Sequence, residues 1–203
     1  MQREEKSERS RRAVLDAALY LFAHQGYRAT TMRQIADRAK VSTGNCYHHF
    51  PDKDAIFLAL IEEYLEITET DRFPFTHVLY HSDPFPDNLE QLGYAARDSV
   101  RQFRNYLALF YVDVIEFGGT HLQKFYSAIS NRYARYFASQ PPDIVKRLRA
   151  NVSPESGLLL TARLCCNYFS LEILFGVPEP FGKKPNEVVQ ELADIIRNGV
   201  CEK

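Results

Sequence analysis

The 203-residue sequence has no tryptophan, only two methionines and four cysteines, none of which form a Cys-x-x-Cys pair. The cysteines are Cys46, Cys165, Cys166 and Cys201, and a bond between the adjacent Cys165 and Cys166 would be strained. This usage predicts reduced thiols in a cytosolic protein rather than a disulfide framework. Whether Cys46 or the Cys165–Cys166 pair has a redox role stays open at this stage.

Long hydrophobic runs are also absent. The very apolar run 107–112 is far too short to cross a bilayer, and the first ten residues contain no apolar stretch of a signal sequence. We therefore expect a soluble, cytoplasmic protein. A Gly-rich phosphate loop, a Ser-His-Asp order and a paired-carboxylate site are missing too, so we predict neither an enzyme nor a cofactor.

The net charge of −1 at first argues against a nucleic-acid partner, but the charge is unevenly distributed. Residues 1–53 contain 10 Lys and Arg against 6 Asp and Glu, a balance of +4. The rest contains 15 against 20, a balance of −5. A basic head on an acidic body is typical of a DNA-binding domain joined to a part with another task.

Helical periodicity dominates the sequence, and no stretch sustains the alternation of a strand. The pattern predicts an all-α fold of about nine helices. The run 106–117 is apolar on all sides, which predicts that it is buried. Residues 71–86 contain Pro74, Pro84 and Pro86, and they are predicted to form a loop.

The clearest functional motif is a helix-turn-helix near residues 31–50. Thr31 and Gln34 fit a capping box, Lys40 and Val41 form the turn, and Ser42 caps a short helix to about residue 49. In such a motif the second helix enters the major groove. Val41, Cys46 and Phe50 can form its core side. Its other side offers hydrogen-bonding groups, a glycine that allows close approach, and a nearby cation: Ser42, Thr43, Gly44, Asn45, Tyr47, His48, His49 and Lys53.

Residues 30–57 resemble the DNA-binding signature of the TetR family of bacterial regulators almost throughout, and Ala17, Phe22, Gly26 and Tyr27 match its lead-in. The resemblance implies that Thr31 and Ser42 hold phosphates, and that His49 and Lys53 touch the DNA backbone. It implies that the groove is read by Thr43, Gly44, Asn45, Tyr47 and His48. The one departure is Cys46, where the family usually has leucine. The implied organisation is a DNA-binding domain over 1–53 and a ligand-binding and dimerisation domain over 54–203.

The middle of the chain is dense in aromatic residues, which predicts a mostly apolar pocket for a small apolar or aromatic effector. The alternative is an aromatic core with carboxylates at its edge. Asp113 and Glu116 lie in the most apolar helix and need a partner or a ligand, because an unpaired buried carboxylate is costly. The predicted ligand-binding residues are Phe103, Tyr106, Phe110, Asp113, Glu116, Phe117, His121, Phe125, Tyr126, Asn167 and Tyr168.

One head contacts too few phosphates for useful affinity, so two heads on a two-fold axis are expected. The last two helices are long and apolar, and dimerisation through them agrees with the TetR resemblance. The alternative is packing within one chain. The predicted homodimer interface consists of Leu158, Leu159, Ala162, Cys166, Phe169, Leu192, Ile195 and Ile196.

His77 and His81 lie four residues apart near Asp83, a spacing that could bind a metal on a helix. Because they fall in the predicted loop, no metal site is predicted. The preferred function is a ligand-responsive repressor that binds a pseudo-palindromic operator as a dimer. Two alternatives remain: a DNA-binding accessory protein without an effector, and an enzyme with a DNA-binding head. The effector, the operator, the regulated genes and the sign of regulation are not determined by the sequence.

Overall fold

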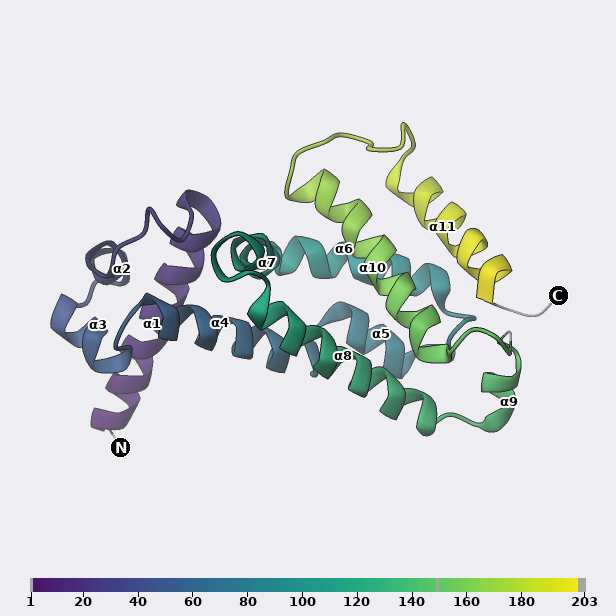
Figure 1. Ribbon diagram of the computed structural model, residues 1–203, viewed down its shortest axis with the longest axis horizontal. Coiled ribbons are helices and arrows are strands. Elements are labelled where there is room, and N and C mark those ends of the chain that lie inside the picture. Colours follow the sequence, from purple (N-terminus) through teal and green to yellow (C-terminus); the bar gives the residue numbers. More distant parts are fainter. Residues whose placement is uncertain (1, 149, 201–203) are drawn as a thin grey trace. The chain divides into compact units, whose positions relative to one another are not determined.

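The computed structural model describes residues 2–148 and 150–200, and every regular element in this part of the chain is a helix (Figure 1). The all-α prediction is therefore confirmed. The described residues form eleven helices rather than about nine. They divide into two compact units, residues 2–66 with 105–125, and residues 67–104 with the described part of 126–200.

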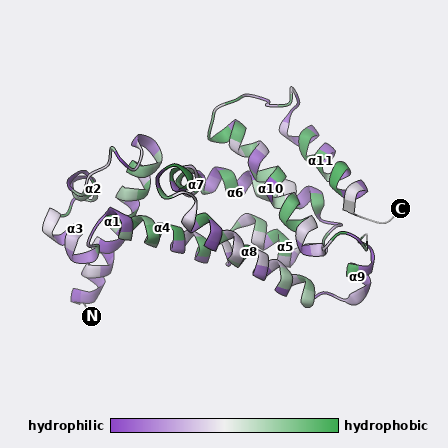
Figure 2. Ribbon diagram, in the orientation of Figure 1, coloured by the Kyte–Doolittle hydropathy of each residue, from purple (hydrophilic) through white to green (hydrophobic). Residues whose placement is uncertain are grey.

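The first unit contains the predicted helix-turn-helix. Its helices are α1 (Gln2–Gln25), α2 (Met32–Ala39), α3 (Thr43–His49), all but the end of α4 (Lys53–Thr68), α7 (Arg104–Phe117) and the start of α8 (Thr120–Ala138). The opening turns of α1 are hydrophilic, as Figure 2 shows by their purple colour. Further along, α1 packs on α2 and α3 through a buried face that includes Val14, Ala18 and Phe22.

The second unit contains most of the C-terminal part of the chain. Its helices are α5 (Pro74–His81), α6 (Leu89–Gln102), the rest of α8, α9 (Pro142–Lys146), α10 (Pro154–Ile173) and α11 (Pro185–Val200). Within this unit α6 is central, because it packs against α5, α10 and α11. The largest buried side chains here include Phe75, Leu92 and Phe169.

The loop predicted over residues 71–86 is wrong in its middle, where α5 forms. Pro74 does not prevent this helix, because it stands in the first turn, where a missing backbone N–H costs nothing. Phe75 and Leu79 anchor α5 by burial, and Phe75 N–H donates to Ser99 Oγ of α6 at 3.2 Å. The helix is therefore stabilised by tertiary contacts that the proline count does not reveal.

The prediction that the run 106–117 is buried on all sides is also wrong for the single chain. Tyr106, Leu109 and Asp113 of α7 are buried, but the side chains of Val114 and Ile115 are 58% and 73% exposed. A helix can bury only the side that meets other elements, whatever the composition of its remaining surface. Among the described residues, no helix is long and apolar enough to span a bilayer.

Candidate nucleic-acid interface

Local hydrogen bonds cap the helices of the helix-turn-helix. Gln34 N–H donates to Thr31 Oγ1 at 3.2 Å, and Thr31 N–H donates to Gln34 Oε1 at 2.8 Å, which completes the predicted capping box. Lys40 ends α2 with a φ of 56°, in the left-handed region that reverses the chain. Ser42 then caps α3 by accepting a hydrogen bond from Asn45 N–H at 3.1 Å.

One side of α3 belongs to the core of the first unit. Cys46 is fully buried, and Phe50, just after the helix, is almost fully buried. Met32, Ile35 and Ala36 supply the buried side of α2. The small side chain of Ala36 allows α2 and α3 to pack closely, and Cys46 takes the place of a larger apolar residue without exposing the core.

The opposite side of α3 is open. Thr43, Gly44 and His48 are exposed, and Tyr47 has 52% of its side chain exposed although it is a large aromatic residue. Asn45 is half-buried, and its Oδ1 has no hydrogen-bond partner within the chain. A helix side that presents a hydroxyl, a phenol, an imidazole and an accessible backbone has the hydrogen-bonding groups needed for DNA bases and phosphates.

His49 and Lys53, which the sequence predicts to touch the DNA backbone, both form contacts within the chain. His49 Nε2 lies 2.6 Å from Ser10 Oγ, and burial together with His48 and Arg11 lowers the pKa of His49. Lys53 Nζ donates to the carbonyl of Tyr27 at 2.8 Å and lies over the Tyr27 ring. Both side chains are half-buried, so they hold the motif together whether or not they also reach a phosphate.

An aromatic cluster joins this motif to α7 within the first unit. Tyr27, in the turn before α2, contacts the rings of Phe22, Phe57 and Phe117 at centroid distances of 5.1, 5.8 and 5.0 Å. Phe117, the last residue of α7, also stacks on Phe57 of α4 at 4.7 Å. The hydroxyl of Tyr27 donates a hydrogen bond to Asp54. Burial is the larger cause, and this hydrogen bond the next, of the raised pKa of Tyr27.

The two carboxylates predicted to need partners in α7 both have them. Asp113 is fully buried; its Oδ1 lies 2.5 Å from His121 Nδ1, and its Oδ2 accepts from Leu122 N–H at 3.0 Å. Asp113 therefore accepts a hydrogen bond from the first turn of α8, where a negative charge is favourable. Glu116 accepts a 2.6 Å hydrogen bond from Arg28, which follows Tyr27.

The predicted ligand-binding residues do not all fall in one unit. Those in the first unit are Tyr106, Phe110, Asp113, Glu116, Phe117, His121 and Phe125. Those in the second unit are Phe103, Tyr126, Asn167 and Tyr168. Among the described residues of the second unit, five buried side-chain atoms have no hydrogen-bond partner within the chain: Asn88 Oδ1, Arg97 Nε, Arg132 Nε, Tyr168 OH and Glu172 Oε2. Tyr168 is among the ligand-binding residues predicted from the sequence, whereas no sequence pattern indicates Arg97.

The predicted dimerisation residues divide by burial. Leu158, Phe169 and Ile196 are buried within the single chain, and Leu159, Ala162, Cys166 and Leu192 are half-buried. Ile195 is 59% exposed, and two leucines of α10 that the sequence reasoning passed over, Leu160 and Leu164, are also exposed. Figure 2 shows apolar residues along much of α10, which is why periodicity alone does not indicate its outer side.

The described cysteines are free, and Cys46 and Cys165 are buried. Burial raises the pKa of Cys46 above its ordinary value and that of Cys165 to about 12. Because the thiolate is the reactive form, both thiols should react slowly at neutral pH. Cys201 lies outside the described residues.

Comparison with known proteins places the helix-turn-helix in a family. Residues 14–60 match the model of bacterial regulatory proteins of the TetR family. The HTH-type transcriptional regulator YuxN of Bacillus subtilis (strain 168) is 30% identical over 103 residues, 51% of this chain and 30% of YuxN. The HTH-type transcriptional repressor KstR2 of Rhodococcus jostii (strain RHA1) is 43% identical over 56 residues, 28% of each protein. The matched segments thus span less than a third of these relatives.

The fold matches over the full length. A TetR family transcription regulator from Marinobacter aquaeolei VT8 superposes with a TM-score of 0.69 over 100% of both chains, at 14% sequence identity. At this identity the likeness concerns the fold alone, while the motif at residues 14–60 carries the sequence relationship. Residues 14–60 therefore carry the DNA-binding motif of the TetR family of bacterial regulators, on a fold that a TetR family regulator shares over its full length.

Proposed function

We propose that this protein is a transcriptional repressor that binds a pseudo-palindromic operator as a homodimer and is released by a small, largely apolar effector. The observation that carries the proposal is the open side of α3, where Tyr47 is half exposed beside Thr43, Gly44 and His48 on a helix whose other side is buried. In this proposal residues 1–53 bind DNA in the cytoplasm, and residues 54–203 bind the effector and the second protomer. Repression is favoured over activation by the repressor KstR2 among the relatives.

The DNA interface in this proposal centres on α3. Thr43, Asn45, Tyr47 and His48 meet base edges, and Gly44 allows the backbone to come close. Thr31 and Ser42 hold phosphates at the starts of α2 and α3, where backbone N–H groups favour an anion. His49 and Lys53 stabilise the motif through their contacts with Ser10 and Tyr27, and they also contribute to the contacts with the DNA backbone.

The dimer interface is proposed on the outer sides of α10 and α11. Leu160 and Leu164 lie one turn apart on α10, and Ile195 is exposed on α11. Exposed apolar side chains gathered on two helices favour association with another surface. The half-buried Leu159, Ala162, Cys166 and Leu192 extend this surface, whereas Leu158, Phe169 and Ile196 support it from inside.

The effector is proposed to bind in the second unit, where buried polar atoms lack partners. An unsatisfied buried polar atom costs about 1–3 kcal/mol, and a ligand that pairs with it recovers this free energy. Tyr168 OH and Glu172 Oε2 on α10 and Arg97 Nε on α6 are such atoms, and α6 packs against α10. The rings of Phe169 and Phe181 lie 5.1 and 4.9 Å from the ring of Tyr168 and supply apolar contacts beside these atoms. Phe103 and Tyr126 of the same unit stay among the proposed effector-binding residues.

The effector signal is proposed to reach α3 through the aromatic cluster of the first unit. Phe117 of α7 and Phe57 of α4 both contact Tyr27, so a shift of either helix changes the support of the turn before α2. Release requires only that the effector bind more tightly to the state that fits the operator less well.

The DNA-binding proposal is tested by selection from random-sequence duplex DNA with the full chain, followed by gel-shift titration of the enriched duplex. We expect an enriched pseudo-palindrome, and about tenfold weaker binding by Tyr47→Ala. The matched control is Tyr111→Ala, because Tyr111 is also exposed but lies on α7. No enriched sequence, or equal loss in both variants, would contradict the proposal.

The dimer and the effector are tested separately. We expect Leu160→Glu with Leu164→Glu to convert the dimer to a monomer in sedimentation equilibrium, whereas Ile115→Glu, on the exposed side of α7, leaves it intact. A thermal-shift screen of small apolar metabolites should yield a stabilising compound that also weakens DNA binding. Stabilisation by none of them would favour the alternative of an accessory protein without an effector.

A further inference from the structure

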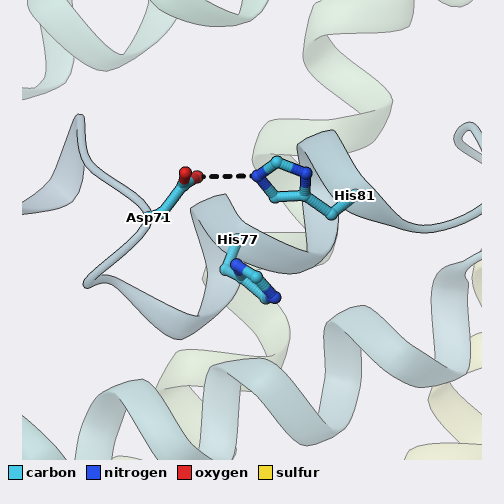
Figure 3. A group of neighbouring side chains, drawn as sticks. All are labelled: Asp71, His77 and His81. Atoms are coloured by element: carbon cyan, nitrogen blue, oxygen red, sulfur yellow. Dashed lines mark hydrogen bonds and ion pairs between the residues drawn. The ribbon is translucent and has the colours of Figure 1, made fainter.

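Outside the proposed DNA and effector sites, three potential metal ligands converge on one side of α5. One ligand atom each from Asp71, His77 and His81 lies within 4.8 Å of the other two, and all three side chains are exposed (Figure 3). His77 and His81 stand one turn apart on α5, with their ring centroids 4.8 Å apart. The sequence places Asp83 near this pair, but the fold brings Asp71 from the turn before the helix instead.

We propose that Asp71, His77 and His81 form a binding site for a divalent transition-metal ion, for which Zn²⁺ is the representative. Two imidazole nitrogens and one carboxylate oxygen are ligands that suit Zn²⁺, whereas Mg²⁺ and Ca²⁺ prefer sites made of oxygen alone. Three protein ligands leave the fourth tetrahedral position to water.

The distance between the ligand atoms of Asp71 and His81 is close to what a tetrahedral zinc site needs, and His77 lies within reach of both. With bonds of about 2.0–2.1 Å, neighbouring ligand atoms stand about 3.4 Å apart. His81 Nε2 is already 3.0 Å from Asp71 Oδ1, so this hydrogen bond has to give way as the ion enters between the two atoms. His77 then approaches by side-chain rotation, which exposure permits because no neighbouring core residue has to move.

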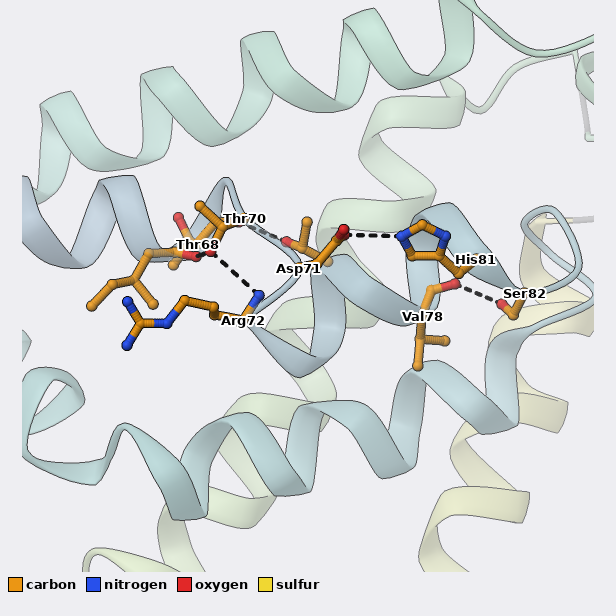
Figure 4. A network of polar contacts seen from close by, with 9 residues as sticks. Thr68, Thr70, Asp71, Arg72, Val78, His81 and Ser82 are labelled. Carbon is orange, nitrogen blue, oxygen red and sulfur yellow. Dashed lines mark hydrogen bonds and ion pairs between the residues drawn. The ribbon is translucent and has the colours of Figure 1, made fainter.

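The backbone that carries the ligands is held in place, as Figure 4 shows. In the turn, Thr70 Oγ1 donates to the carbonyl of Ile67 at 2.9 Å and accepts from Arg72 N–H at 3.3 Å. At the end of α5, Ser82 Oγ donates to the carbonyl of Val78 at 2.7 Å. The Arg72 side chain extends away from His81 in this view, so its positive charge does not occupy the space between the ligands.

The inner side of α5 strengthens the same argument. Thr76 Oγ1 donates to the carbonyl of Thr68 at 2.6 Å, and Arg132 of α8 donates to the same carbonyl. The end of α4, the turn and α5 are thus tied together beneath the exposed ligands. A metal ion bound by Asp71 and the two histidines would add a link across the outer side of this turn.

The test is titration of the full-length protein with Zn²⁺ against a chromophoric chelator, together with Co²⁺ as a spectroscopic probe. We expect one ion per chain, and Co²⁺ absorption typical of nitrogen and oxygen ligands without a thiolate charge-transfer band. His77→Ala, His81→Ala and Asp71→Asn should each weaken Zn²⁺ binding at least about tenfold. His24→Ala is the matched control, because His24 is an exposed histidine on α1.

The variants concern exposed side chains, so their circular dichroism and their thermal unfolding without metal should match those of the wild type. Zn²⁺ should raise the unfolding temperature of the wild type and of His24→Ala but not that of His77→Ala. The proposal is overturned if Zn²⁺ binds equally well to His77→Ala, if His24→Ala has the same effect as His77→Ala, or if Co²⁺ reports thiolate ligands.

Discussion

The ring of Phe117, at the end of α7, lies 5.0 Å from the ring of Tyr27, in the turn before the helix-turn-helix, at an interplanar angle of 68°. T-shaped aromatic pairs of this kind are favourable beyond the area that they bury. The same Phe117 ring stacks on Phe57, which is fully buried in α4. A single side chain of α7 therefore supports both the turn before α2 and the helix that follows α3.

Phe117→Ala should lower the free energy of unfolding by about 2 kcal/mol, because Phe117 is half-buried and a fully buried phenylalanine contributes about 3–5 kcal/mol. Urea denaturation measures this change. Val114→Ala, on the exposed side of the same helix, should stay within about 0.5 kcal/mol of the wild type. Equal effects of the two substitutions would mean that the Phe117 contacts contribute no stability.

Gly44→Ala should separate folding from DNA binding. A Cβ at Gly44 meets no atom within 4 Å, and alanine is more favourable than glycine within a helix by about 0.5–1 kcal/mol. We therefore expect a higher unfolding temperature, with DNA affinity reduced about tenfold because the methyl group stands between α3 and the groove. Unchanged affinity in a gel-shift titration would show that the DNA does not approach this glycine.

Gly93→Ala should have the opposite effect on stability. A Cβ at Gly93 of α6 would lie only 2.8 Å from Cγ1 of the buried Val189 of α11. Overpacking of this kind costs about 1–3 kcal/mol. Adding Val189→Ala removes the obstructing methyl group, so the double variant should be more stable than the sum of the single changes predicts. Strict additivity in denaturant titrations would argue against this close approach of α6 and α11.

His49 should make folding sensitive to acid. Burial lowers its pKa below the ordinary 6.5, and His48 and Arg11 act in the same direction, while Glu8 opposes them. The folded state thus favours the neutral ring, and this contribution to stability is present above pH 6.5 and is lost as the pH falls through the folded-state pKa.

His49→Gln should therefore lose less stability than the wild type between neutral and mildly acidic pH. The comparison is made by urea denaturation of each protein at both pH values. His24→Gln, at an exposed position of α1, serves as the control and should follow the wild type. A steeper acid loss in His49→Gln than in the wild type would reverse the sign assigned to the His49 shift.

The helix-turn-helix could be predicted in detail because its determinants are local. Thr31 and Gln34 cap the N-terminus of α2, and Ser42 caps that of α3. The four-residue spacing of Cys46 and Phe50 places both on one buried side. Such capping and spacing rules depend on neighbours within a few residues. The all-helical composition follows for the same reason, since each helix has its own periodicity or boundary residues.

Tertiary structure alone decided which sides of the apolar helices are exposed. Periodicity does not distinguish Leu158 from Leu160 in α10, because leucines occur around the helix, yet only Leu160 is exposed. The fold likewise turned a proline-rich segment into α5, by burying Phe75 and Leu79 against the rest of the second unit. It then placed Asp71 beside His81 across ten residues of chain.

The sequence by itself therefore determined the DNA-binding motif and its family, since these depend on short-range hydrogen bonding and spacing. It did not determine how Asp113 comes to be buried while Ile115, two residues later, is exposed. That outcome depends on which side of α7 meets its neighbours, and on the backbone N–H of Leu122 and the ring of His121, which together compensate a buried carboxylate. Burial is a property of the surroundings in space, and those surroundings come from residues that are distant in the chain.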